Sequence, residues 1–237
     1  MKNLLYTCLS YKVVLLFIGF TGTLNAQNNC SQFYPSEIGK TMILHHYNHK
    51  NKLSSKTAYS VANINSSGSK TEITMNMDLI DGKRNNSISK AEFKITCDGE
   101  TTYLDPESII SPQLFSQYEG MEYTIDGTDI SIPNLLTVGQ ELPDGQVTMS
   151  VNVGGMGITM DIKLLNRTVT AKENIRTNAG SFDCYLIEYT NETKMSMGIR
   201  QTLAVKQWIA KDAGLVKQET RKQNGKLMTK SILEQYN

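Results

Sequence analysis

Apolar and polar residues alternate through most of the chain. In residues 71–80, one face of an extended strand would carry only apolar side chains, namely Ile73, Met75, Met77 and Leu79. The same alternation recurs in 57–64, 91–97, 146–153, 157–165, 182–189, 201–210 and 214–220. Each of these segments is therefore predicted to be a half-buried β-strand.

Short turn sequences separate these segments. Asp-Gly pairs occur at 81–82, 98–99, 126–127 and 144–145, and such pairs favour tight turns between antiparallel strands. Strands at regular spacing joined by short turns predict a meander. Because several segments are long for strands, we expect a mainly β fold in which a long, strongly curved antiparallel sheet forms a half-barrel or open barrel.

One region departs from the alternation. Ser111 can cap a helix that starts at Pro112, and Leu114, Phe115 and Tyr118 would lie near one face of it. We expect one short helix near 111–118, packed on the sheet or plugging it.

The N-terminal segment has the layout of a secretory signal. Lys2 and Lys12 precede an apolar run over 13–20, which is followed by small and polar residues up to Ala26. We expect a signal peptide over 1–26 and a single β-rich domain over 27–237. No later run of roughly 18 apolar residues follows, so no membrane-spanning helix is expected.

The position of Cys30 bears on lipid anchoring. Gln27, Asn28 and Asn29 precede it, whereas a lipidation signal would place apolar and small residues there. We therefore expect no lipidation signal and a periplasmic or secreted location.

The cysteines left after the signal are Cys30, Cys97 and Cys184. Cys184 lies in an apolar strand pattern and fits a buried free thiol. Because an exported protein encounters an oxidising environment, Cys30 and Cys97 are predicted to form a disulfide.

Charge excludes some partners. The chain has 24 Lys and Arg against 23 Asp and Glu. Residues 1–26 contain two of the basic residues, Lys2 and Lys12, and no acid, so 22 basic residues face 23 acidic ones in the rest. A near-neutral chain gives no electrostatic reason to expect a nucleic-acid partner.

Catalytic and metal motifs are sparse. The chain has no G-x-S-x-G, H-E-x-x-H, C-x-x-C or P-loop sequence, so we expect neither enzymatic activity nor a cofactor. The three histidines are His45, His46 and His49. On an extended strand the first and last would lie about 13 Å apart, too far for one metal ion unless a turn at Asn48 brings them together.

Methionine is frequent, with 11 residues in the chain. Pairs occur at Met75/Met77 and Met195/Met197, and Met149, Met156 and Met160 flank Gly154-Gly155, which we expect to form a turn or bulge. Methionine can ligate copper(I), but it also fills cores and lines apolar pockets. Two thioethers of an M-x-M pair lie about 7 Å apart on a strand, so one copper ion would need a neighbouring strand.

Four ordered segments carry a family resemblance. They read NCSQFYPSEIGKTM, SPQLFSQYEGMEYTIDGTDISIPNLLTVGQELPDG, NAGSFDCYLIEYT and QWIAKDAGLVKQETRKQNGKLM. Together they resemble TapB-like proteins, an exported bacterial family of unknown function. The resemblance implies a curved antiparallel sheet similar to the half-barrel of periplasmic lipoprotein carriers, whose concave face holds acyl chains. It implies no catalytic residues.

Three functions follow as hypotheses. The first is an exported, non-enzymatic protein that binds a lipid or other hydrophobic ligand in the concavity of its sheet. Its expected lining residues are Met75, Met77, Met149, Met156, Met160, Met195, Met197 and Trp208. The second is a structural or interaction module of the cell envelope with a packed core, and the third is periplasmic copper binding. An internal void of several hundred Å³ would favour the first hypothesis over the second.

Overall fold

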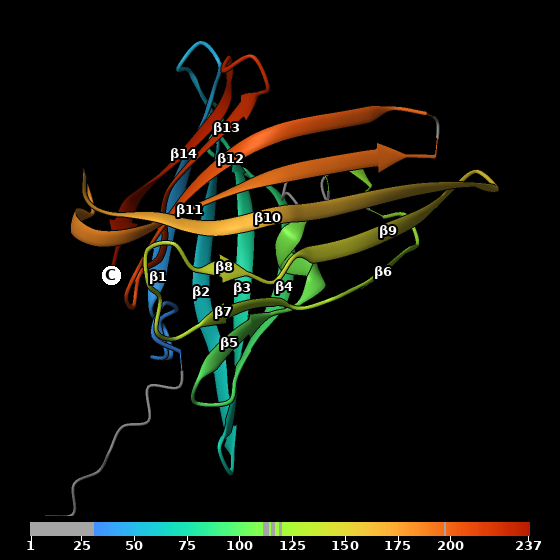
Figure 1. Ribbon diagram of the computed structural model, residues 1–237. Helices are drawn as coiled ribbons and strands as arrows, with labels where there is room; N and C mark the ends of the chain where they lie inside the picture. Colours follow the sequence, from blue (N-terminus) through green and yellow to red (C-terminus); the bar gives the residue numbers. More distant parts are fainter. Residues whose placement is uncertain (1–30, 111–113, 115–116, 119, 197) are drawn as a thin grey trace, which may run out of the picture.

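The protein is mainly β in the computed structural model, which describes residues 31–110, 114, 117–118, 120–196 and 198–237 (Figure 1). The strands are β1 (Thr41–Asn48), β2 (Leu53–Ser67), β3 (Lys70–Asp81), β4 (Ser87–Cys97), β5 (Thr101–Leu104), β6 (Tyr123–Gly127), β7 (Ile130–Pro133), β8 (Glu141–Leu142), β9 (Gly145–Val153), β10 (Met156–Thr177), β11 (Gly180–Met195), β12 (Arg200–Ala210), β13 (Gly214–Lys222) and β14 (Leu227–Tyr236). The predicted signal peptide lies outside the described residues.

All fourteen strands belong to one antiparallel sheet. Its order is β6-β9-β10-β11-β12-β13-β14-β1-β2-β3-β4-β5-β7, with β8 paired to β10 beside this path. Most neighbours in space are neighbours in sequence, and the sheet curves strongly (Figure 1). The predicted long, curved antiparallel meander is therefore confirmed. The sheet stays open, because the strand order does not close on itself.

One very short segment links the two ends of the sheet. β6 pairs with β9 at one end of the order, and β7 pairs with β5 at the other. Only Thr128 and Asp129 separate β6 from β7. The chain thus crosses from one edge of the sheet to the other over 123–133, and this crossing helps to enclose the concave side.

The turn expected at Gly154-Gly155 is confirmed. Both residues have positive φ, 58° and 86°, and they join β9 to β10. A two-residue turn of this kind matches the twist of the flanking strands, and glycine adopts it without a steric penalty.

A continuous apolar cluster fills part of the concave side. Ile73 and Met75 of β3 are fully buried, as are Val147 of β9 and Ile187 of β11. These side chains come from strands far apart in sequence. They meet in one cluster because the curvature of the sheet brings the inner faces of these strands together. Alternation in the sequence therefore becomes an inward apolar face in the structure.

The region of the expected helix is described only in part. Leu114 and Gln117 are helical, and the other residues of the interval 111–117 lie outside the described residues. A 3-10 helix, η1 (Pro106–Ile109), precedes them. The sequence reading missed η1, which follows Asp105 and has proline at its first position.

The cysteines occupy distinct environments. Cys97 is fully buried and disulfide-bonded. Cys184 is a buried free thiol, and burial raises its pKa to about 12. Cys30 lies outside the described residues, so the Cys30–Cys97 pairing stays a prediction.

Candidate ligand cavity

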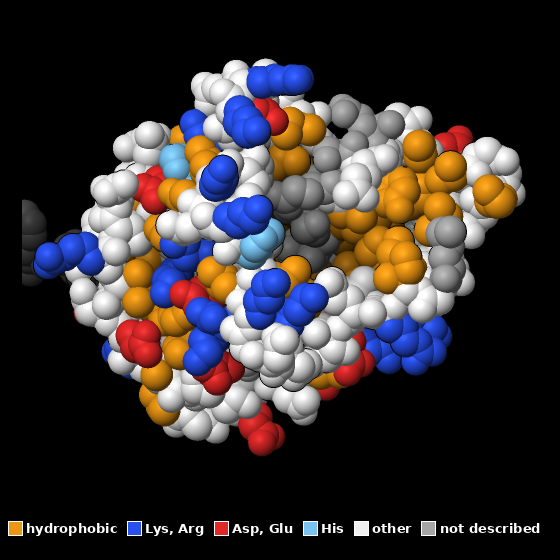
Figure 2. Space-filling model, turned by 90° about the horizontal axis from the view of Figure 1, so that it is seen from above, with side chains coloured by type: hydrophobic (Ala, Val, Ile, Leu, Met, Phe, Trp, Pro, Cys, Tyr) orange, Lys and Arg blue, Asp and Glu red, His pale blue; other side chains and the backbone are white. Residues whose placement is uncertain are grey.

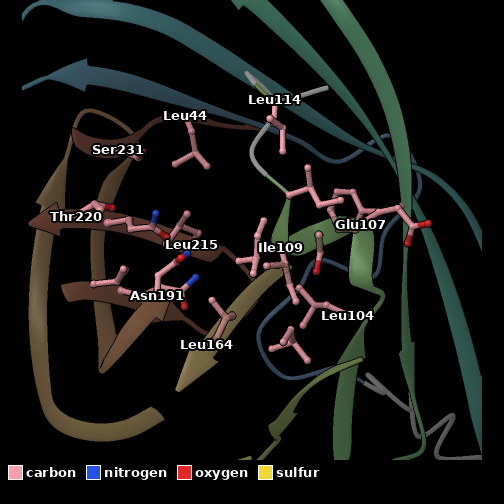
Figure 3. A pocket seen from close by; sticks show the side chains of 18 of the residues that line it. Leu44, Leu104, Glu107, Ile109, Leu114, Leu164, Asn191, Leu215, Thr220 and Ser231 are labelled. Carbon is pink, nitrogen blue, oxygen red and sulfur yellow. The ribbon is translucent and has the colours of Figure 1, made fainter. Parts of the chain in front are cut away.

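A cavity of about 680 Å³ lies on the concave side of the sheet. Side chains from η1 and from β1 to β5, β7 and β10 to β14 line it. In Figure 3, Leu104, Ile109 and Leu114 stand on one side of this space, and Leu164, Asn191 and Leu215 stand on the other. The cavity exists because strands of opposite parts of the sheet face each other across it.

Much of the wall is apolar. On β10, Met160, Ile162 and Leu164 point inward in strict alternation, and each is at least nine-tenths buried. Met75 and Met77 of β3 line the cavity in the same way. Flexible thioether side chains can adjust their shape to an apolar surface, so this wall suits a hydrocarbon.

A second part of the wall is polar but uncharged. It consists of amide and hydroxyl side chains from β11 to β14, namely Asn191, Thr193, Gln201, Gln207, Gln218, Thr220, Thr229 and Ser231. These groups can make hydrogen bonds without a full charge. The cavity is therefore amphipathic, with an apolar wall and a neutral polar wall.

His46 lines the cavity as a hydrogen-bonded neutral side chain. Its Nδ1 lies 2.8 Å from the Ser231 hydroxyl, and its Nε2 lies 2.7 Å from the Thr57 hydroxyl. Burial lowers its pKa to about 4. His45 follows the opposite phase of β1, and His49 lies in the exposed turn after it. Across the described part of the chain, no three His, Cys, Asp or Glu side chains are grouped to hold a metal ion.

Arg167 is a buried cation in the cavity wall, with an exposed fraction of 3%. Its Nη1 donates hydrogen bonds to the backbone carbonyls of Ser131, at 3.3 Å, and Pro143, at 2.5 Å. No carboxylate of the described residues lies within 4.0 Å of its guanidinium. Burial accordingly lowers the pKa of Arg167, because desolvation disfavours the charged form.

Two tyrosines line the cavity within electrostatic range of Arg167. Burial raises the pKa of Tyr34 well above its usual range and that of Tyr189 to about 12, and the Arg167 charge opposes both shifts. Both phenols are therefore protonated at neutral pH. Each keeps an O–H that can donate a hydrogen bond.

Of the eight expected lining residues, Met75, Met77 and Met160 lie in the cavity wall. Met149 is 1% exposed and belongs to the packed core instead. Met195 is half-buried against that core, opposite Met160 on β10. Met197 lies outside the described residues.

Met156 and Trp208 lie away from the cavity. Met156 is 71% exposed, because it directly follows the turn at the tip of the β9–β10 hairpin. Trp208 directly follows Gln207, which lines the cavity. Because successive side chains of a strand point to opposite faces, Trp208 lies on the other face of β12. There its Nε1 donates a 2.7 Å hydrogen bond to Glu173, and the Lys217 ammonium lies 4.3 Å from the ring centroid. Trp208 is thus a buried anchor outside the cavity lining, 5% exposed and part of the apolar cluster.

Sequence reasoning missed Arg167 for a physical reason. The inward residues of β10 are even-numbered up to Leu164, so strict alternation would turn Arg167 outward. The pairing of β10 with β11 shifts register between Leu165 and Thr168. This irregularity brings an odd-numbered cation to the inner face. The positive φ of 56° at Asn166 marks the same irregularity.

Exposed apolar side chains include several near the far ends of the long hairpins. Met121, Tyr123, Met156 and Ile199 are between 39% and 71% exposed. In the view of Figure 2, apolar side chains gather over one end of the molecule. Polar and charged side chains cover most of the rest of that face.

A long antiparallel sheet curved around an amphipathic cavity defines the class of this protein. The family model described as DUF3108-like matches residues 37–233. The chain therefore belongs to the DUF3108-like family. The TapB-like name and the similarity to lipoprotein carriers stay predictions.

Two solved structures share the fold. One, from Bacteroides fragilis, is described as an exported protein with a YmcC-like fold; it is 18% identical, with a TM-score of 0.76. The other, from Parabacteroides distasonis, is described as a lipoprotein and is 21% identical, with a TM-score of 0.77. Each comparison covers 88% of this chain and all of the other. None of the curated proteins compared with the chain matches it.

The described residues also bear on membrane topology. None of their helices has the length and hydrophobicity needed to cross a bilayer.

Proposed function

We propose that this protein is a non-enzymatic component of the cell envelope that binds a lipid or another hydrophobic ligand in its cavity. One observation carries the proposal: the cavity of about 680 Å³ inside the curved sheet. Its volume falls in the range of about 300–1,000 Å³ typical of small-molecule sites. The descriptions of the two similar structures, as an exported protein and a lipoprotein, support the envelope location.

The energetics favour hydrocarbon. Each methylene transferred from water to an apolar wall contributes about 0.8 kcal/mol. Met75, Met77 and Met160 supply adaptable contacts on that wall. A ligand with an alkyl chain would therefore gain affinity with every carbon that the cavity accommodates.

The alternative function, a structural or interaction module, requires a packed interior. A cavity of this size disfavours that alternative. Copper binding by the methionines remains a separate hypothesis. It predicts tight Cu(I) binding that is lost when Met75→Leu and Met77→Leu are combined.

The proposal is tested by blocking the cavity. Ala91 lines it and lies opposite Met77 in the pairing of β3 with β4. An Ala91→Trp variant would fill the space, whereas Lys90→Trp adds the same ring at the exposed neighbouring position. The measurement is equilibrium binding of N-phenyl-1-naphthylamine, an apolar fluorescent probe, to the purified protein.

We expect the wild type and Lys90→Trp to bind the probe alike, and Ala91→Trp to bind at least about tenfold more weakly, a loss of about 1.4 kcal/mol. Circular dichroism and thermal unfolding confirm that the variants are folded. Absence of binding by the wild type, or equal binding by a folded Ala91→Trp variant, would contradict the proposal.

A further inference from the structure

The cavity contains an isolated positive charge. Arg167 is the only Lys or Arg among the described residues that line it. His46 is uncharged at neutral pH, because its pKa is about 4. A guanidinium removed from water without a carboxylate partner costs free energy, and pairing with an anion offsets that cost. No carboxylate of the described residues lies within 4.0 Å of Arg167, so its charge favours an anion bound beside it.

The hydrogen bonds of Arg167 leave a defined part of it free to bind. Both recorded bonds, to the carbonyls of Ser131 and Pro143, come from Nη1. They fix the plane of the guanidinium and leave the Nε and Nη2 edge without a hydrogen-bond partner among the described residues. Parallel N–H groups on one edge of arginine match the two oxygens of a carboxylate.

The acidic side chains of the lining disfavour a doubly charged anion. Glu92 and Glu107 are the acids in the lining, so the cavity has no excess of positive charge for a dianion. A phosphate monoester carries about 1.5 to 2 negative charges at neutral pH, whereas a carboxylate carries one. Tyr34 and Tyr189 add neutral hydroxyl donors to the same cavity.

We propose that the ligand is a long-chain carboxylic acid, whose carboxylate binds the Nε and Nη2 edge of Arg167 while its alkyl chain lies against the apolar wall of β3 and β10. This inference rests on the proposed function and narrows it to a class of ligand. It makes Arg167 a residue that determines specificity, in addition to linking β10 to β7.

The test compares ligands that differ only in the head group. Oleic acid, oleyl alcohol and methyl oleate are titrated against N-phenyl-1-naphthylamine bound to the wild type, to Arg167→Met and to Arg167→Lys. Arg176→Met is the matched control, because Arg176 is an exposed residue of the same strand. Thermal unfolding of each variant is measured in parallel.

We expect the wild type and Arg176→Met to bind oleic acid about 10- to 100-fold more tightly than oleyl alcohol, as for a charge-assisted pair. Arg167→Met should abolish this preference. Arg167→Lys should retain only part of it, because an ammonium lacks the planar fork.

The outcomes separate the two proposals. Equal wild-type affinity for oleic acid and oleyl alcohol would overturn the carboxylate inference and leave hydrophobic binding intact. A preference that persists in Arg167→Met would also overturn it. Displacement of the probe by none of the three ligands would reject this lipid class. Failure of the wild type to bind the probe itself would count against the proposed function. Because the wild-type comparison needs no variant, it decides the question even if Arg167→Met does not fold.

Discussion

Arg167 on β10 donates a hydrogen bond to the backbone carbonyl of Ser131 on β7, which precedes it by 36 residues. β10 lies near one end of the strand order, and β7 is the strand at the other end. The contact therefore links strands from opposite ends of the strand order at the cavity wall. It gives Arg167 two separable roles, a structural link and a candidate ligand contact.

The change in the free energy of unfolding on replacing Arg167 distinguishes these two roles. If the hydrogen bonds to Ser131 and Pro143 dominate, Arg167→Met should lower the free energy of unfolding by about 3 kcal/mol or more. We expect a smaller loss, under about 1 kcal/mol, because removing an unpaired buried charge also removes its desolvation cost. Urea denaturation of the ligand-free protein measures the difference, with Arg176→Met as the control. A large loss would show that the residue is primarily structural.

Two groups whose pKa values are shifted by burial, His46 and Asp105, should give stability opposite dependences on pH. Burial holds the pKa of His46 at about 4, so its contribution is present above about pH 6.5 and is lost as the pH falls towards 4. Burial raises the pKa of Asp105 to about 6, so its contribution is present below about pH 4 and is lost as the pH rises through 6. In the wild type these slopes oppose each other.

Single substitutions should expose each slope. With Asp105→Asn, stability should rise with pH between about 4 and 6.5, because the substitution removes the opposing Asp105 effect and keeps the His46 effect. With His46→Gln, stability should fall with pH over the same interval. Each change should be on the order of 1–3 kcal/mol. Urea denaturation at a series of pH values tests this, and parallel profiles for both variants would refute the assignment.

The Asp105 effect has a structural basis. Its Oδ2 accepts a 2.6 Å hydrogen bond from the backbone N–H of Lys94. Its Oδ1 is buried and has no hydrogen-bond partner within the described part of the chain. An ionised carboxylate is unfavourable there, because one of its oxygens is buried without a hydrogen-bond donor. An asparagine side chain keeps an acceptor for the Lys94 N–H and carries no charge.

The cysteines should differ in both stability and reactivity. Cys97→Ser should lower the free energy of unfolding by about 2–5 kcal/mol, because it removes a disulfide. Cys184→Ala should cost far less, on the order of 1 kcal/mol. Since burial raises the pKa of Cys184 to about 12, its thiol should resist iodoacetamide in the native protein at pH 8 and react after unfolding. Peptide mapping without reductant identifies the partner of Cys97, and a partner other than Cys30 would contradict the predicted pairing.

Gly127 should be needed where the chain leaves β6 for the opposite sheet edge. A Cβ there would overlap the carbonyl oxygen of Gln146 and lie 2.9 Å from the Val147 Cα, both backbone atoms of β9. Gly127→Ala should therefore destabilise the protein by about 1–3 kcal/mol. Gly157→Ala is the matched control, because its Cβ meets nothing within 4 Å. Equal thermal unfolding of the two variants would show that the crossing tolerates a side chain.

Much of the fold could be predicted from local patterns. The alternation of Ile73, Met75, Met77 and Leu79 correctly assigned the buried face of β3, because side-chain direction in a strand depends only on position. Glycines at 154 and 155 located a hairpin turn for the same local reason. The expected curvature followed from strand length and turn spacing.

The cavity could not be derived in this way. Whether an apolar face meets a packed core or an open space depends on distant strands, which is why Met149 and Met160 differ although they pair directly. The face of Trp208 was ambiguous, because both faces of β12 carry apolar residues near its end. Arg167 could not be predicted as a cavity residue, because a register shift turns it inward. The alternation of apolar and polar residues does not reveal such a shift.

The cavity should hold a hydrophobic ligand in the purified protein. The most direct measurement is organic-solvent extraction of the purified protein followed by mass spectrometry, with the Ala91→Trp variant prepared in parallel. We expect a co-purifying lipid in near-stoichiometric amount from the wild type and a clear depletion of it from the variant. Repeated absence of any lipid from the wild type, together with no binding of the apolar probe, would contradict it.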